Sequence, residues 1–144
     1  MARLVTDRRD EVMRAIYDTT LSVEGDRDIW ARMGGTYERY AEFYKDALVV
    51  GVEVAGRLVG GVMYLDGVAH LGIRPEGQYR WARLYPQMLQ VGFDRFGPRL
   101  LARVHEKNTR ARRFVQRIGC IERRTRNGYV EYDIYQKDIH GLRR

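Results

Sequence analysis

The sequence predicts a single domain of the mixed α/β (α+β) class over residues 1–144, and three observations lead to this prediction. The chain has 144 residues, of which 44% are hydrophobic, the size and composition of one domain with a full core. Its apolar residues recur at helical spacing in some stretches and form β-rich runs in others. Two tight-turn signals, Ala55-Gly56 and Asn127-Gly128, mark hairpins between such runs. The resulting order of elements is βααβββαβαββ.

The first part of the chain predicts one short strand and two helices. Residues 2–6 suit a strand, and Asp7 can cap a helix that follows it. In that helix the apolar side chains of Val12, Ile16 and Leu21 recur at roughly helical spacing. A polar break at Glu24-Gly25-Asp26 precedes a second helical stretch, which the Gly34-Gly35 pair weakens. Its apolar residues, three or four apart, are Trp30, Met33, Tyr37, Tyr40 and Tyr44.

The middle of the chain predicts three strands and then a helix. Residues 47–54 and 57–65 are β-rich and form the first hairpin. Residues 68–73 give a third short strand that ends before Pro75. A helix follows between Trp81 and Gly92, and its Pro86 lies near the first turn or kinks the helix.

The last third predicts one buried strand, one helix and a second hairpin. Gly97-Pro98 ends the preceding helix, and residues 100–105 read as a buried strand. Asn108 then offers a cap for a helix that Gly119 closes in the position preferred for a C-terminal cap. The two final strands, residues 121–126 and 129–136, flank the turn at Asn127-Gly128.

The composition narrows the compartment and the kinds of site. The single cysteine, Cys120, excludes an internal disulfide, and no His/Cys spacing suits a structural zinc site, so we expect no metal. No apolar run approaches the ~20 residues that span a bilayer, and the N-terminus does not resemble a signal peptide. We therefore expect a soluble, cytoplasmic protein with no membrane partner.

The charge is strongly asymmetric along the chain. Residues 1–72 carry 9 Lys/Arg against 12 Asp/Glu, whereas residues 73–144 carry 17 against 7, which accounts for the net charge of +7. Such an excess suits an anionic ligand: nucleic acid, an acidic protein face or a phosphate-rich cofactor. The alternative is an ordinary solubilising surface.

The segment NTRARRFVQRIGC resembles a signature of the GNAT superfamily of N-acetyltransferases, N-x-x-A-x-x-F-x-x-x-x-G, at Asn108, Ala111, Phe114 and Gly119. The hairpin VGVEVAGRLVGGVMYL is similar to the second and third strands of that family. The resemblance implies a GNAT-like mixed central sheet of about six to seven strands flanked by four helices.

The same resemblance implies acetyl-CoA, or another acyl-CoA, as a cofactor between the strands at residues 68–73 and 100–105. The backbone from Leu71 to Ile73 would pair with the pantetheine arm, to which Asn108 and Ala111 would also lie close. For Asn108, a plain helix cap and a ligand contact both stay open, since one side chain can serve either purpose. The pyrophosphate would meet the loop and helix N-terminus after Pro75, where free N–H groups favour an anion.

Two stretches depart from the family pattern. In the phosphate loop Gln78 matches, but Trp81 and Arg83 stand where the family has small residues. Arg80 and Arg83 could bind phosphate through side-chain ion pairs instead, or Trp81 could simply be the first core residue of the following helix. Val115 stands where many members have a tyrosine that protonates the leaving thiolate, and valine cannot transfer a proton.

The candidate catalytic residues are two histidines. His70 and His105 lie on the two strands of the proposed site, and an imidazole can take either proton role near neutral pH. Both could equally be structural residues. Cys120 is interpreted as core filler. Aromatic residues of the second helical stretch either pack in the core or wall the acceptor pocket: Trp30, Tyr37, Tyr40, Phe43 and Tyr44.

Three functions fit these observations. The first is acyl transfer to an amine of a small molecule or protein. The second is a GNAT-like protein that has lost catalysis, similar to small members found in bacteriophages, and that binds a host protein. Nucleic-acid binding ranks last. It would use a basic face of Arg110, Arg112, Arg113, Arg117, Arg123, Arg124 and Arg126. Family members often form homodimers, and the acceptor is not readable.

Overall fold

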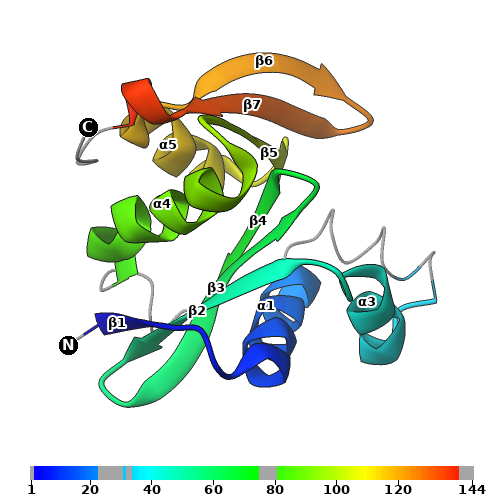
Figure 1. The fold of residues 1–144 in the computed structure, drawn as a ribbon. Helices are drawn as coiled ribbons and strands as arrows, with labels where there is room; N and C mark the ends of the chain where they lie inside the picture. The colour runs from blue at the N-terminus through cyan, green and yellow to red at the C-terminus, as the bar shows by residue number, and fades with distance from the viewer. Residues whose placement is uncertain (1, 23–30, 32–33, 75–80, 140–144) are drawn as a thin grey trace.

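A computed structural model describes residues 2–22, 31, 34–74 and 81–139 and contains one seven-stranded sheet (Figure 1). The strands follow in the spatial order β1-β2-β3-β4-β5-β7-β6. Their bounds are β1 Ala2–Val5, β2 Leu48–Val54, β3 Arg57–Leu65, β4 Val68–Ile73, β5 Arg99–His105, β6 Ile121–Arg126 and β7 Tyr129–Tyr135. The helices are α1 Arg9–Ser22, α3 Tyr37–Phe43, α4 Tyr85–Phe96 and α5 Thr109–Ile118, with short 3-10 segments η2 Trp81–Leu84 and η3 Gln136–Asp138. The predicted fold class is confirmed.

Both predicted hairpins form, because their turn residues adopt the left-handed backbone that a two-residue turn requires. Ala55 and Gly56 have φ of 52° and 80°, and Asn127 and Gly128 have φ of 54° and 82°. Positive φ at both central positions matches the twist of the flanking strands. The first turn joins β2 to β3, and the second joins β6 to β7.

The second predicted helix is shorter than its apolar spacing suggested. Gly34 and Gly35 have φ of 105° and 57°, which a helix cannot contain, and Thr36 then caps a new helix, α3, by accepting a hydrogen bond from Arg39 N. A continuous helix through Gly34 is therefore wrong. The residues Glu24, Gly25, Asp26, Trp30 and Met33 lie outside the described part of the chain. At the first helix, α1 begins at Arg9, so Asp7 lies one position too early to be its flanking cap residue.

The helices divide between the two faces of the sheet. On one face, α1 and α3 enclose an apolar cluster that includes Ile16, Tyr40 and Met63. On the other face, α4 and α5 cover a larger cluster that contains Tyr64 and Tyr132. Figure 1 shows α1 and α3 at one end of the sheet and α4 and α5 toward the other. Strands β2 and β3 are thus covered on both faces.

Helix α1 packs directly on the backbone of β4. A Cβ atom at Gly72 would lie 2.2 Å from Thr19 Oγ1 and 3.2 Å from Ile16 Cα, so no larger residue fits there. This close packing fixes β4, the strand that carries His70, against the helix layer. No helix in the described part of the chain is long and apolar enough to cross a membrane.

Candidate active site

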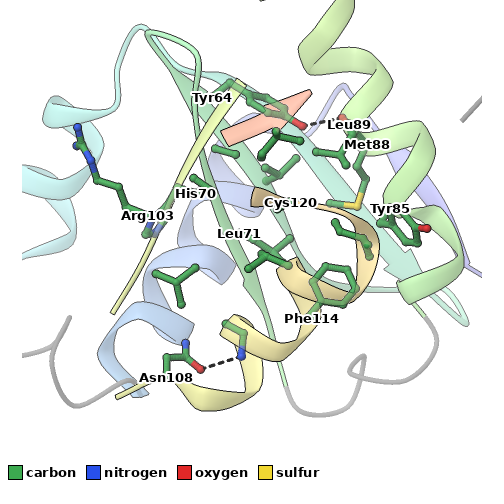
Figure 2. Close-up of a pocket in the computed structure, with 18 of the residues that line it drawn as sticks. Tyr64, His70, Leu71, Tyr85, Met88, Leu89, Arg103, Asn108, Phe114 and Cys120 are labelled. Atoms are coloured by element: carbon green, nitrogen blue, oxygen red, sulfur yellow. Dashed lines mark hydrogen bonds between the residues drawn. The ribbon is translucent and has the colours of Figure 1, made fainter. Parts of the chain in front are cut away.

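The sheet opens between its two parallel strands. Pairing of β4 with β5 consists of Val68 with Leu101 and Ala69 with Ala102, and β5 diverges from β4 beyond this point. A cavity lies in the gap, as Figure 2 shows. Its lining comes from β4, β5, α4 and α5 and includes Ala69, His70, Leu71, Ala102, Arg103, His105, Asn108, Ala111, Phe114 and Val115. These are the two strands between which the family resemblance implies the cofactor.

The signature segment forms the helix that closes one side of the cavity. Asn108 Oδ1 accepts a hydrogen bond of 3.2 Å from Ala111 N, so Asn108 is the N-terminal cap of α5. Gly119 ends the helix with φ of 110° in the left-handed region. Asn108 and Ala111 both line the cavity, which leaves a ligand contact compatible with the cap.

Aromatic side chains make the apolar wall of the cavity. Trp81 is buried, and its ring lies 4.7 Å from that of Phe114, between centroids, while Tyr85 meets Phe114 edge-on at 5.8 Å. Trp81 opens η2, which leads into α4, so its interpretation as the first core residue of that helical region agrees with the structure. Its indole Nε1 is buried without a hydrogen-bond partner in the described part of the chain.

His70 faces the layer formed by α1 and α3. Its Nε2 lies 3.3 Å from Thr20 Oγ1, and its ring stacks on Tyr44 at a centroid distance of 5.6 Å. Tyr40, fully buried, lies within 6.4 Å of the same ring. The aromatic row therefore splits: Tyr40 is core, whereas Phe43 is 51% exposed. Tyr44 holds His70 at the edge of the cavity.

His105 lies at the end of β5 and is held by its own turn. Its Nδ1 accepts a hydrogen bond of 3.2 Å from Lys107 N, and its ring packs edge-on against Tyr129 at 5.2 Å. An Nδ1 that accepts carries no proton, so the neutral ring keeps its proton on Nε2. Both predicted histidines line the same cavity, yet each has structural contacts of its own.

Two other polar groups of the cavity are held in their neutral forms. Burial raises the pKa of the Cys120 thiol to about 12, so at neutral pH it is not a thiolate nucleophile. Burial likewise raises the pKa of Tyr64, whose hydroxyl donates a hydrogen bond of 2.7 Å to Met88 O. The interpretation of Cys120 as core filler agrees with the burial of its thiol.

The predicted cofactor residues are only partly gathered at the cavity. Leu71 lines it and is 40% exposed, whereas Ile73 is buried and is not part of the lining. Arg83 is exposed on η2, away from the lining. Three residues named for the predicted phosphate loop lie outside the described residues: Pro75, Gln78 and Arg80. No group of three or more His, Cys, Asp or Glu in the described part of the chain is placed to hold a metal ion.

Sequence reasoning missed Arg103, a charged residue of the cavity lining. In a sheet, paired residues point to the same face, so the pairing of Val68 with Leu101 places His70 and Arg103 on one face. Both also line the cavity. Finding Arg103 from the sequence would have required the register of β4 against β5, which the two strands do not encode locally.

No family model and no curated protein matches the chain. Several solved structures do match the chain. The PaiA N-acetyltransferase of Thermoplasma acidophilum, in complex with coenzyme A, matches with a TM-score of 0.69 at 13% identity, covering 94% of this chain and 99% of that one. A spermidine N-acetyltransferase SpeG chimera from Vibrio cholerae and hSSAT gives 0.67 at 18% identity over 94% and 96% of the two chains.

The ribosomal-protein-S18-alanine N-acetyltransferase of Escherichia coli gives a TM-score of 0.64 at 12% identity over 94% of each chain. At these identities the likeness concerns the fold. The chain therefore has the fold of GNAT acetyltransferases.

Proposed function

We propose that this chain is an acetyl-CoA-dependent N-acyltransferase whose thioester lies in the gap between β4 and β5. The observation that carries the proposal is the end of β4–β5 pairing at Ala69 and Ala102, directly over a cavity with two histidines on its rim. The fold neighbours support it, because one of them is a coenzyme A complex and others are N-acetyltransferases of a polyamine and of a protein.

The chemistry of the lining fits the pantetheine end of the cofactor. An alkyl chain with two amides needs an apolar wall with a few hydrogen-bonding groups, and Phe114 and Leu71 supply such a wall. Trp81 Nε1 is a buried donor beside it without a protein partner in the described residues. Asn108, at the start of α5, would contact an amide of the ligand in addition to capping the helix. The backbone at Leu71 would complete the pantetheine end of the proposed cofactor site, and roles for Ile73, Gln78, Arg80 and Arg83 stay predictions from the sequence.

One histidine would take the proton of the amine, and the other would stabilise the leaving thiolate. The amine nitrogen forms a bond to the thioester carbonyl carbon, the carbon–sulfur bond breaks, the amine loses a proton and the thiolate gains one. His70, on the face of α1 and α3, would accept the amine proton. His105, whose neutral ring keeps a proton on Nε2, would donate a hydrogen bond to the sulfur as negative charge develops there, which Val115 cannot do, and the thiolate would take its proton from water.

Isothermal titration with acetyl-CoA tests the proposal, and a pair of cap variants localises the site. Asn108→Ser keeps a side-chain cap on α5 and removes the amide. We expect it to weaken acetyl-CoA binding by about tenfold, the loss of one good ligand hydrogen bond. Thr36→Ala removes the cap of α3, and because Thr36 is not part of the cavity lining, it should leave affinity unchanged. Absence of heat at millimolar acetyl-CoA would overturn the proposal.

A second function is favoured by Trp81 and Val115. Trp81 fills, with a buried ring, a position where the family has a small residue beside the phosphate, and Val115 lines the cavity where a tyrosine acid is usual. On this alternative the chain is a catalytically inactive, phage-type protein that binds a host protein. Acetyl transfer that is lost in His70→Ala or His105→Ala would exclude it.

A further inference from the structure

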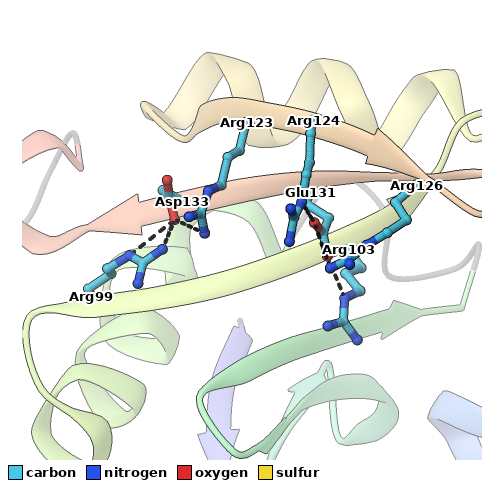
Figure 3. Close-up of polar contacts among 7 residues, drawn as sticks. All are labelled: Arg99, Arg103, Arg123, Arg124, Arg126, Glu131 and Asp133. Carbon is cyan, nitrogen blue, oxygen red and sulfur yellow. Dashed lines mark hydrogen bonds and ion pairs between the residues drawn. The ribbon is translucent and has the colours of Figure 1, made fainter.

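The open face of β5, β7 and β6 carries a cluster of arginines around two acids (Figure 3). Along β7, Val130, Tyr132 and Ile134 pack into the core under α4 and α5, and the intervening Glu131 and Asp133 therefore point to the other face. We call this surface the arginine face. Its members are Arg99, Arg103, Arg123, Arg124 and Arg126, with Glu131 and Asp133.

The two acids organise the arginines. Glu131 contacts Arg124 Nε at 2.5 Å, Arg103 Nε at 3.1 Å and Arg126 Nη2 at 3.7 Å. Asp133 contacts Arg99 Nη2 at 2.6 Å and Arg123 Nη1 at 3.9 Å. Hydrogen bonding to Arg124 lowers the pKa of Glu131 to about 2, as expected for a carboxylate among guanidinium groups.

The face nevertheless keeps a positive excess that is open to solvent. The two acid side chains are 12% exposed or less, whereas the five arginine side chains are 43–54% exposed. Five guanidinium groups against two carboxylates leave three unbalanced positive charges, and an arginine fork can bind a further carboxylate. The face can therefore bind negative charge without dismantling its own ion pairs.

This face continues into the proposed active site. Arg103 belongs to both, because it contacts Glu131 and lines the cavity. The register of β4 and β5 places Arg103 on the same face of the sheet as His70. An amine that reaches His70 from this side brings the rest of its molecule over the arginines.

We propose that the acceptor is an acidic peptide segment, with its amine in the gap between β4 and β5 and its carboxylates on the arginine face. The inference rests on the proposed function and names its substrate class. From Arg99 to Arg103 the face runs about 13 Å along β5, and from β5 to β6 about 10 Å across, at ordinary strand dimensions. A single small anion cannot occupy that area, whereas an extended chain with several carboxylates can.

The same arrangement argues against nucleic acid as the occupant. The sequence grouped arginines of residues 110–117 with those of residues 123–126, but α5 packs on the core face of β7, where Arg112 lies 3.4 Å from the Tyr132 hydroxyl. The two groups therefore lie over opposite faces of the sheet and do not form one basic surface.

Direct binding of labelled peptides tests the proposal without requiring turnover. Three peptides with the same free N-terminal residue would continue with a run of glutamates, glutamines or lysines, and fluorescence anisotropy would give each Kd. We expect the glutamate peptide to bind at least about tenfold more tightly than the glutamine peptide, and this preference to shrink as salt is raised. Equal affinity for these two peptides would overturn the proposal.

A matched pair of double variants localises the binding. Arg123→Gln/Arg126→Gln removes the two arginines with the longest ion pairs and leaves the three shorter ones in place. Arg57→Gln/Arg95→Gln removes two exposed arginines elsewhere and gives the same net charge. We expect the first pair to lose about tenfold in affinity for the glutamate peptide and the second to stay within about twofold. Equal losses would overturn the assignment, and thermal unfolding checks that both variants fold.

Further arms separate the two proposals and the competing occupant. Acetyl-CoA binding with no preference for the acidic peptide would leave the proposed function standing and remove this inference. Acidic-peptide binding without acetyl-CoA binding would overturn the proposed function and leave the arginine face standing as a docking surface for acidic peptides. A single-stranded oligonucleotide that binds as tightly as the glutamate peptide, with the same loss in Arg123→Gln/Arg126→Gln, would replace the peptide by nucleic acid.

Discussion

The two halves of the sheet, on either side of the β4–β5 gap, differ in how much of their surface is buried. Strands β2 and β3 are covered on both faces, and most of their residues are buried. Strands β5 and β7 are covered on one face, and all six residues of the neighbouring strand β6 are exposed. A strand buried on both faces gains stability from apolar contact, whereas an open face can hold charge. The N-terminal half is thus a buried platform, and the C-terminal half is an open half that holds charge.

Replacing one tyrosine in each half gives the largest expected difference in the free energy of unfolding. Tyr40 is fully buried among Tyr17, Tyr44 and Ile16, so Tyr40→Ala should lower the free energy of unfolding by about 3–5 kcal/mol. Tyr135, at the end of β7, is half-buried, so Tyr135→Ala should lower the free energy of unfolding by about 1 kcal/mol or less. Urea unfolding measures both. Similar losses would contradict the division into a platform and an open half.

A pair of glycines separates backbone strain from close packing in the two halves. Gly56 has φ of 80° with open space around it, and Gly56→Ala should cost about 1–2 kcal/mol for the left-handed backbone alone. Gly119 has φ of 110°, and a Cβ there would lie 2.3 Å from Asp138 O. Gly119→Ala should therefore cost about 1 kcal/mol or more beyond Gly56→Ala, because η3 must shift as well. Equal thermal unfolding of the two variants would show that η3 is not held against α5.

The sequence sufficed for the fold because its local signals agree with one another. The turns at Ala55-Gly56 and Asn127-Gly128 and the capped helix between Asn108 and Gly119 each depend on a few neighbouring residues. The prediction failed at Gly34-Gly35, where the apolar spacing of the tyrosines outweighed a backbone signal that ends the helix.

The candidate site was harder to predict because its geometry depends on long-range pairing. His70 and His105 were selected by residue type, but the position of Arg103 follows from the register of β4 against β5. The arginines at residues 123–126 were read as one basic surface with those of α5, since a charge count does not tell which face of a strand meets which helix. Burial of Glu131 and Asp133 beneath arginines was likewise invisible in the sequence.

The smallest expected difference between the halves concerns Glu131, whose contribution to stability depends on pH. Its folded-state pKa of about 2 lies below the ordinary glutamate value of about 4.3, so its contribution to stability is full above the latter and disappears as pH falls toward about 2. Glu131→Gln cannot ionise and leaves Arg103, Arg124 and Arg126 without their shared acid. We expect a lower Tm than the unsubstituted chain at pH 7 and the same Tm near pH 2, by calorimetry across that range.

The control for this last measurement is Glu38→Gln, an exposed glutamate of α3 in the other half. Its substitution should leave the pH dependence of Tm unchanged, because surface carboxylates without close guanidinium groups contribute little. If Glu131→Gln and the unsubstituted chain differ in Tm by the same amount at pH 2 and pH 7, the carboxylate acts by packing and not by charge. In that case the arginines are not organised by Glu131, and the open half would hold its charges without an internal counter-ion.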